Sequence, residues 1–221
     1  MLNSFAGMCG QLLGSNYIKF GAKTGFAKTH TKELEINSID DPHLRKYTPK
    51  VYGVYMEPER EAYVLVMELL RNMTNMDSVS DISVWKKDHI IAVLDGAAEI
   101  HSIHYKKTEE LCKKDWIGFV PDYKSMVDMG ELWEALGVHT REEFPEWFSQ
   151  RRFELHRLLV RNIPNWWKEL DSYDRTLIHN DFNPRNIALR NIGDGFQLCV
   201  YDWELATVHL PQHDLAEFLV F

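Results

Sequence analysis

The chain has 221 residues, 45% of them hydrophobic and 26% charged, so it can bury a proper core as one domain or two small lobes. Its formal net charge of −8 argues against a general nucleic-acid-binding protein, which normally presents a basic face. Its three cysteines lie far apart, which excludes a disulfide framework, and no apolar run reaches the ~18–20 residues of a membrane span. Because the N-terminus has no signal-peptide pattern, a soluble, cytoplasmic protein is expected.

The first part of the chain is expected to be rich in β-structure. Residues 1–32 are rich in Gly, Ser and Thr and carry four lysines and no acidic residue. Within them, short β-like runs lie at Tyr17–Phe20 and Gly25–Thr29. The next pattern has cap-type residues followed by spaced apolar ones, which predicts a short helix over Thr31–Ile39.

A hairpin and a long helix are predicted next. Two strand-like runs, Val51–Tyr55 and Ala62–Met67, flank a polar turn and predict an antiparallel hairpin. Residues 71–83 are polar and are expected to form a loop. Residues 85–105 have their apolar side chains at helical spacing, which predicts an amphipathic helix.

The rest of the chain is predicted to be mainly helical and then to form a small β-cluster. Residues 106–145 are expected to alternate short segments and turns, and a second long helix is expected over Phe144–Leu170, broken at Pro164. Three short apolar runs follow, at Thr176–Ile178, Ile187–Leu189 and Leu198–Tyr201. The Asp-Gly pair between the last two suits a hairpin turn. This order indicates a two-lobed α+β protein with the joint near Glu68–Asn75.

A polar segment, LIHNDFNPRN at residues 177–186, connects the first two of these apolar runs. It holds a carboxylate, Asp181, and a carboxamide, Asn186, on a loop where side chains can converge, and a second carboxylate, Asp202, follows the apolar run LCVY. Phosphoryl transfer needs such groups, because one carboxylate orients the attacking hydroxyl while a carboxamide and a second carboxylate hold Mg²⁺ on the nucleotide phosphates. A loop in which the same residue types serve only turn formation is the alternative.

The spacing of these polar residues resembles that of a known family. The segments HNDFNPRN at residues 179–186, YDWE at 201–204 and HDLA at 213–216 look like the signature of the aminoglycoside phosphotransferase/choline kinase-like family. That family has the protein-kinase-like fold, so the resemblance implies an abbreviated β-rich N-lobe and a helical C-lobe that carries a small β-cluster.

The resemblance also implies roles for five polar residues. Asp181 would be the catalytic base, and Asn186 and Asp202 would be ligands of Mg²⁺. His179 would be a structural member of the catalytic loop, and Asp214 would brace this loop from below.

Two upstream segments extend the resemblance. VLVMELL at residues 64–70 is similar to the hinge between the lobes, where the backbone of Glu68, Leu69 and Leu70 would meet adenine. AAEIHSIH at residues 97–104 looks like a helix of the family, with His101 at its histidine position.

The lysine and glutamate of the nucleotide site are expected near the N-terminus. GFAKT resembles the lysine strand of the family, which implies that Lys28 contacts the phosphates, with Lys23 and Lys19 as alternatives. KELEI resembles the helix whose glutamate pairs with this lysine, at Glu33 or Glu35. A solvated lysine on an edge strand explains Lys28 equally well. The candidates for a phosphate-covering loop are Gly7, Gly10 and Gly14.

The sequence is interpreted as one kinase-like domain, with an N-lobe at residues 1–70 and a C-lobe at residues 71–221. The N-lobe is abbreviated, because only four residues separate Lys28 from Glu33. The expected activity is transfer of the γ-phosphoryl group of ATP, with Mg²⁺, to a hydroxyl group of a small molecule, and neither nucleic acid nor a membrane is expected as a partner. Because the chain ends at Phe221 within a helix-like run, a fragment or an unusually short family member is expected.

Two other functions fit the same residues. The abbreviated N-lobe favours a catalytically impaired kinase that serves as an interaction module. A metal-dependent phosphoester hydrolase would instead use Asp181, Asn186 and Asp202 directly. Residues 106–170, in which acceptor specificity is expected to lie, contain no legible motif, so the sequence leaves the acceptor open.

Overall fold

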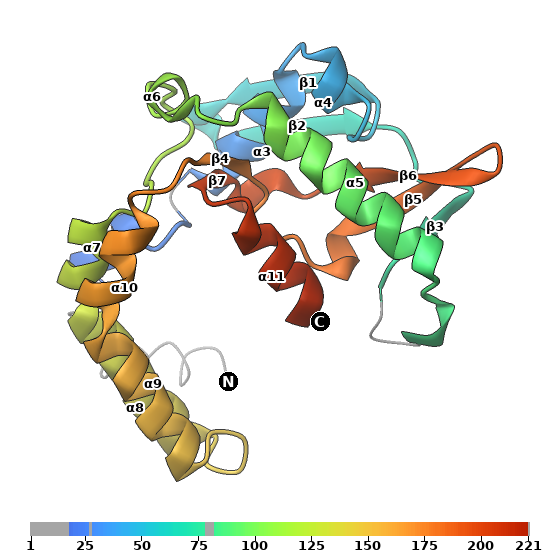
Figure 1. The fold of residues 1–221 in the computed structure, drawn as a ribbon. Helices are drawn as coiled ribbons and strands as arrows, with labels where there is room; N and C mark the ends of the chain where they lie inside the picture. Colours follow the sequence, from blue (N-terminus) through green and yellow to red (C-terminus); the bar gives the residue numbers. More distant parts are fainter. Residues whose placement is uncertain (1–17, 27, 78–81, 221) are drawn as a thin grey trace. The chain divides into compact units, whose positions relative to one another are not determined.

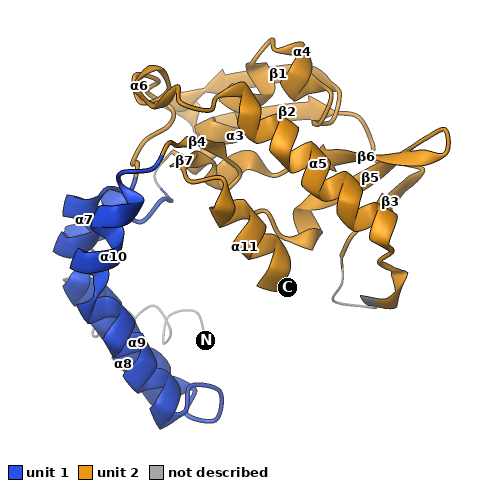
Figure 2. Ribbon diagram, viewed as in Figure 1, with its two compact units in different colours: residues 1–27, 121–173 blue, residues 28–120, 174–221 orange. Residues whose placement is uncertain are grey.

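The structure is a computed structural model that describes residues 18–26, 28–77 and 82–220. The chain divides into two compact units, of which unit 1 comprises residues 1–27 and 121–173 and unit 2 comprises residues 28–120 and 174–221 (Figure 2). Helices and small antiparallel sheets are mixed along the chain, in agreement with the α+β class (Figure 1). The lobes expected at residues 1–70 and 71–221 follow another division of the chain and stay a prediction.

Unit 2 begins with two helices and a hairpin. These elements are α3 (Thr29–Ser38), α4 (Pro42–Arg45), β1 (Val51–Glu57) and β2 (Ala62–Met67). Helix α4 begins at a capping carboxylate, since Asp41 accepts a hydrogen bond from the backbone N–H of His43 at 2.8 Å. Strands β1 and β2 pair antiparallel, so both the helix and the hairpin predicted for this region are confirmed.

Two further sheets organise the second half of unit 2. Strands β3 (Met73–Asn75), β5 (Ile187–Ile192) and β6 (Gly195–Val200) form one antiparallel sheet, and β4 (Thr176–Ile178) pairs with β7 (Thr207–His209). The prediction of a loop throughout residues 71–83 was wrong at β3, because pairing with β5 makes this polar segment a strand. Gly193 and Asp194 form the turn between β5 and β6, one residue before the predicted Asp-Gly pair.

Helix α5 (Lys87–Ile103) confirms the long helix predicted for this region and lies against β6 (Figure 1). Its buried face includes Val93, Gly96, Ala97 and Ile100. Gly96 is a point of close approach to β6, because a Cβ atom at this position would lie 2.6 Å from Cβ of Leu198. Unit 2 also contains α6 (Thr108–Leu111) and α11 (Gln212–Val220), and α11 buries Asp214 and Phe218.

Unit 1 is helical in its described part. It contains α7 (Tyr123–Asp128), α8 (Gly130–Glu143), α9 (Gln150–Arg161) and α10 (Ile163–Leu170). The single helix predicted over Phe144–Leu170 is two helices, because the chain turns at Asn162, and Pro164 lies in the first turn of α10, where proline is tolerated. The fourteen residues of α8 were predicted as short segments, and this prediction was wrong.

The β-like runs predicted near the N-terminus are also wrong. Residues 18–20 are helical and Gly21–Lys23 form a 3₁₀ turn, while Thr29 begins α3. No strand partner lies beside the described part of these runs, and short runs without a partner do not form strands. Tyr17 and Ala27 lie outside the described residues.

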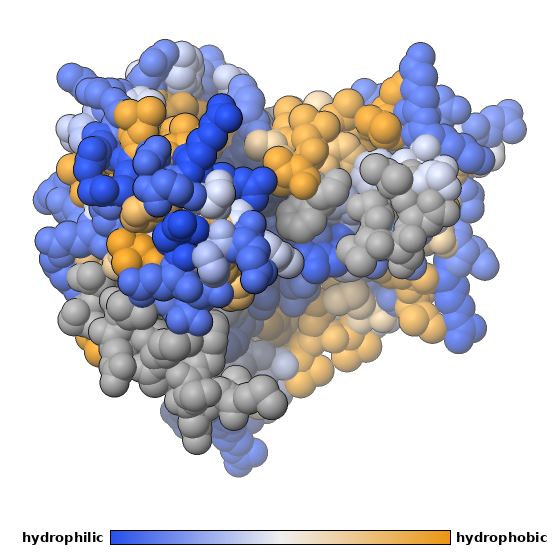
Figure 3. Space-filling model, turned by 90° about the horizontal axis from the view of Figure 1, so that it is seen from below, coloured by the Kyte–Doolittle hydropathy of each residue, from blue (hydrophilic) through white to orange (hydrophobic). Residues whose placement is uncertain are grey.

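The described surface carries apolar side chains on α5 and at the end of α11. Ile91, Leu219 and Val220 are exposed there, and apolar side chains gather on the face seen from below in Figure 3. Within the residues that the structure describes, no helix is both long and apolar enough to cross a membrane.

The close approach of α5 to β6 predicts the effect of Gly96→Ala. Alanine favours a helix over glycine by about 1 kcal/mol, but overpacking a core costs about 1–3 kcal/mol. Because Leu198 is held in the middle of β6, we expect a net loss of free energy of unfolding, measured by urea denaturation. The control is Gly53→Ala on β1, where a Cβ atom meets nothing within 4 Å. Stability of Gly96→Ala equal to that of the control would contradict this packing.

Candidate active site

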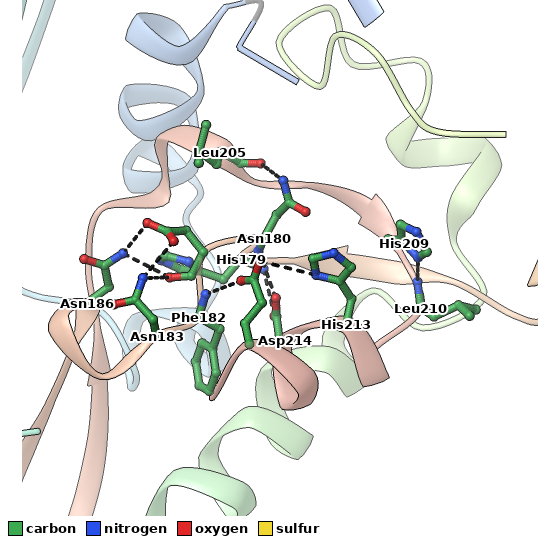
Figure 4. Close-up of polar contacts among 12 residues, drawn as sticks. His179, Asn180, Phe182, Asn183, Asn186, Leu205, His209, Leu210, His213 and Asp214 are labelled. Carbon is green, nitrogen blue, oxygen red and sulfur yellow. Dashed lines mark hydrogen bonds and ion pairs between the residues drawn. The ribbon is translucent and has the colours of Figure 1, made fainter. Parts of the chain in front are cut away.

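The loop between β4 and β5 brings Asp181 and Asn186 into direct contact. Asn186 donates from Nδ2 to Asp181 Oδ2 at 2.8 Å and to the Asp181 carbonyl oxygen at 3.0 Å. Asn183 donates from Nδ2 to Asp181 Oδ1 at 2.7 Å. Figure 4 shows the side chains of Asn183 and Asn186 lying close together on this loop. Each carboxylate oxygen of Asp181 therefore accepts a hydrogen bond from a carboxamide that the loop itself supplies.

The turn that precedes β5 positions Asn183 and Asn186 for their contacts with Asp181. Pro184–Asn186 form a 3₁₀ turn, in which the side chain of Asn183 accepts a hydrogen bond from the Arg185 N–H at 3.0 Å. Because the Nδ2 group of Asn186 is directed to Asp181, its Oδ1 atom is left as an acceptor. Among the described residues, no donor bonds to Oδ1 of Asn186. A carboxamide oxygen that accepts no hydrogen bond can bind a hard cation such as Mg²⁺.

Asp202 lies two residues beyond the end of β6, beside the same turn. The pairing of Ile187 with Val200 continues outside the sheet, since the Tyr201 N–H donates to the Asn186 carbonyl oxygen at 3.2 Å. Asp202 itself is half-buried and has left-handed backbone angles, with φ of 67°. Aspartate is among the few residues that adopt this conformation at low cost. The fold thus brings the backbone of Asp202 next to that of Asn186.

His179 is a buried link between β4 and the segment after β6. Its Nε2 atom lies 3.0 Å from the Tyr201 carbonyl oxygen, and its ring packs on Trp203 with a centroid distance of 4.7 Å. Burial lowers the pKa of His179, so the ring is neutral and its Nε2–H donates to this carbonyl. This contact suits the structural role that the resemblance implied for His179.

Asp214 on α11 binds the start of the loop through three hydrogen bonds. It accepts from the backbone N–H of His179 at 2.9 Å and from that of Asn180 at 2.8 Å (Figure 4). It also accepts from Nε2 of His101 on α5 at 2.8 Å. The carboxylate is only 1% exposed. Burial acts to raise the pKa of Asp214, but the hydrogen bonds from His101 and His179 outweigh it and hold this pKa below its usual range. Asp214 is therefore a charged brace under the loop.

Glu217 is a second contact from α11 to the loop, and the sequence analysis missed it. Its carboxylate accepts a hydrogen bond from the backbone N–H of Phe182 at 2.8 Å, and burial raises its pKa. The signal was present in the sequence, because positions three apart on a helix share one face and Glu217 follows Asp214 by three residues.

His213, Asp214 and Glu217 also present ligand atoms that all lie within 4.8 Å of one another. Both oxygens of Asp214 already accept hydrogen bonds, so this group is poorly suited to a metal ion. His209 lies in β7 rather than on α11, and burial lowers its pKa to about 4.

Lys28 and Glu33 lie on the same short stretch but do not pair with each other. Lys28 is exposed at the N-terminus of α3, and its Nζ donates to the backbone carbonyl of Asp115. Glu33 lies beside Asp202 and Glu204 instead. Burial raises the pKa of Glu33, and the charges of these two carboxylates raise it further. Lys28 was also considered as a residue of an edge strand, and this was wrong, because it caps a helix.

The alternative lysines are engaged within unit 1. Lys19 forms an ion pair with Glu131 at 3.0 Å, and Lys23 lies 3.8 Å from Asp128. A further lysine that the sequence analysis passed over, Lys32 on α3, is 1% exposed, and burial lowers its pKa. The phosphate-loop candidates Gly7, Gly10 and Gly14 lie outside the described residues.

Glu68 fastens the end of β2 to β5. Its carboxylate forms an ion pair with the guanidinium of Arg190 and accepts a hydrogen bond from the Lys50 N–H at 2.8 Å. The hydrogen bond from Arg190 holds the pKa of Glu68 below its usual range. Leu69 is exposed, and its carbonyl oxygen accepts from the Arg71 N–H at 2.8 Å, while Leu70 is half-buried. Contact of these backbone groups with adenine stays a prediction.

An α+β chain with a paired aspartate and asparagine on one loop, and a further aspartate beside it, has the arrangement expected of a phosphotransferase. A family model described as "Phosphotransferase enzyme family" matches residues 46–221. The chain therefore belongs to this family, as the resemblance predicted. The match includes the loop, Asp202 and Asp214, and it begins after Lys28 and Glu33. No curated protein matches the chain significantly.

The three hydrogen bonds to Asp214 predict a large effect for Asp214→Asn. The carboxamide offers one acceptor oxygen and turns an NH₂ group toward an N–H donor, so at least one buried donor loses its partner. We expect a loss of about 2–4 kcal/mol in free energy of unfolding, measured by urea denaturation. Asp194→Asn makes the same chemical change in the exposed β5–β6 turn and should change stability by no more than about 0.5 kcal/mol. Equal effects of the two substitutions would refute the brace.

Proposed function

We propose that the protein transfers the γ-phosphoryl group of ATP to a hydroxyl group of a small molecule. The observation that carries this proposal is the contact between Asp181 and Asn186, in a chain whose family is one of phosphotransferases. Both side chains come from one short loop, and Asp202 is brought to the same turn by the β5–β6 pairing. A carboxylate base and two oxygen ligands for Mg²⁺ are among the groups that phosphoryl transfer requires.

Asp181 would act on the acceptor. Its carboxylate is half-buried and is held by two carboxamide donors, which fix its orientation. An acceptor hydroxyl that hydrogen-bonds to this carboxylate would be directed at the γ-phosphorus and would pass its proton to Asp181 as the new P–O bond forms. The bond from the γ-phosphorus to the bridging oxygen breaks in the same step, and ADP is the leaving group.

Asn186 and Asp202 would hold Mg²⁺. Their donor set of one carboxamide oxygen and one carboxylate suits this hard cation, and Oδ1 of Asn186 accepts no hydrogen bond from the described residues. The ion supplies charge neutralisation of the nucleotide phosphates when bound. The backbone of Glu68, Leu69 and Leu70 would bind adenine.

A catalytically impaired interaction module is the second candidate. It is favoured by the surroundings of Glu33, which lies among carboxylates, and by the contact of Lys28 with a backbone carbonyl. The two candidates differ in nucleotide binding. A rise in melting temperature with ATP that requires Mg²⁺ supports the enzyme, and no rise supports the interaction module.

Asp181→Asn tests the proposed enzyme. The variant keeps the size and polarity of the side chain but cannot accept a proton, so the rate of ATP-dependent phosphorylation should fall about 10²–10⁴-fold. The measurement is ATP consumption in a screen of hydroxyl-bearing metabolites, including aminoglycosides, choline, sugars and amino-acid alcohols. Asp194→Asn, an exposed turn residue, should retain the wild-type rate.

Three outcomes of this screen would overturn the proposal. A signal that is unchanged in Asp181→Asn would show that Asp181 is not the base. A screen without any ATP consumption would leave the interaction module as the better account. Phosphate release from phosphoesters without a nucleoside triphosphate would favour a metal-dependent hydrolase.

A further inference from the structure

A hollow of about 490 Å³ lies in unit 2, away from the loop of Asp181. Its walls come from the end of α4 and the segment that follows it, from the end of β2 and from the β5–β6 hairpin. The lining residues include Arg45, Lys46, Thr48, Lys50, Glu68 and Arg190. The volume is within the range of about 300–1,000 Å³ that is usual for small-molecule sites.

The hollow is cationic, although the chain as a whole is acidic. Four basic side chains line it, together with a single acidic one, Glu68, in a chain of formal charge −8. Lys46 is paired with Glu99 at 3.1 Å, and Arg190 is paired with Glu68. Among the described residues, no carboxylate forms an ion pair with Arg45 or Lys50. Nζ of Lys50 lies 5.3 Å from the centre of the Tyr52 ring, and its charge also acts on Glu68. The four cations therefore outnumber the two carboxylates, Glu68 and Glu99, that pair with them.

Thr48 adds an independent observation. The residue lines the hollow and is 3% exposed, yet its Oγ1 atom has no hydrogen-bond partner. A buried hydroxyl without a partner costs about 1–3 kcal/mol, so such groups are uncommon unless a ligand or water uses them. The carbonyl oxygen of the same residue accepts from Nη2 of Arg190 at 3.3 Å. The backbone of Thr48 is thus held next to the Arg190 guanidinium.

This hollow is separate from the loop of Asp181, although Glu68, whose backbone is proposed to bind adenine, also lines it. Arg190 lies four residues along β5 from Asn186, and a strand rises about 3.3 Å per residue, which separates the two backbones by roughly 13 Å. Gln197, directly opposite Arg190 on β6, also lines the hollow.

We infer that this hollow is a second binding site, for a small phosphate-bearing molecule with at least two negative charges. Two guanidinium groups, two ammonium groups and a free hydroxyl supply the donors that a phosphoryl group accepts. Arginine in particular matches the paired oxygens of a phosphate through its planar fork. A phosphate-bearing ligand would neutralise Arg45 and Lys50 and would give Thr48 the partner that it lacks.

Titration calorimetry of the whole chain with inorganic tripolyphosphate, in the presence of EDTA, tests this site. We expect saturable binding of one tripolyphosphate per chain. The double variant Arg45→Gln/Lys50→Gln should weaken the Kd at least tenfold, because it removes the two cations that form no ion pair with a described carboxylate. Lys87→Gln, which removes an exposed lysine of α5 outside the hollow, should bind as the wild type does.

Two more variants separate this site from its alternatives. Thr48→Val removes only the hydroxyl and should weaken binding several-fold while the melting temperature stays equal or rises, because no internal hydrogen bond is lost. Asp181→Asn should bind tripolyphosphate normally, since it alters the other site. No saturable binding, binding that survives Arg45→Gln/Lys50→Gln, loss of binding in Asp181→Asn, or equally tight binding of citrate would each overturn the inference.

Discussion

The buried carboxylate of Asp214 is the interaction on which the candidate site depends. It accepts hydrogen bonds from two consecutive backbone N–H groups, of His179 and Asn180, and from His101 on α5. One side chain therefore joins α11, α5 and the loop between β4 and β5. Asn180 has left-handed backbone angles, with φ of 63°, and without the Asp214 carboxylate the N–H groups of His179 and Asn180 would lose their acceptor. Asp181 directly follows this turn, so the contact between Asp181 and Asn186 depends on the position in which Asp214 holds the turn.

The parts of the fold that local pattern determines were predictable from the sequence. The spacing of apolar residues specified α5, and the two apolar runs around a polar turn specified the β1–β2 hairpin. By contrast β3 and β7 are three-residue strands that exist because β5 and β4 pair with them, and no local signal marks such short polar or mixed segments. The break between the two helices was predicted at Pro164 but lies at Asn162. Proline is tolerated in the first turn of a helix, so Pro164 marks the start of α10 rather than an interruption.

The candidate site also has some features that the sequence predicts and others that depend on tertiary contacts. The spacing of His179, Asp181 and Asn186 predicted one loop, and the structure brings the last two into hydrogen-bond contact. Glu217 could have been found from its place three residues after Asp214 on one helix face, whereas the unpartnered hydroxyl of Thr48 arises from burial and has no local signal. The neighbours of Glu33 are carboxylates rather than a lysine, and Lys28 contacts the backbone carbonyl of Asp115. The pairing of Lys28 with Glu33 that the resemblance implied is therefore absent from the described structure.

The central claim is that Asn186 and Asp202 hold a metal ion while Asp181 faces the acceptor. A crystal structure of the chain with Mg²⁺ and a non-hydrolysable ATP analogue tests it most directly. The account predicts Mg²⁺ at about 2.0–2.1 Å from Oδ1 of Asn186 and from a carboxylate oxygen of Asp202, with Asp181 outside the coordination shell. A metal ion bound instead by His213 and Glu217, or a nucleotide whose metal ion contacts neither Asn186 nor Asp202, would contradict it.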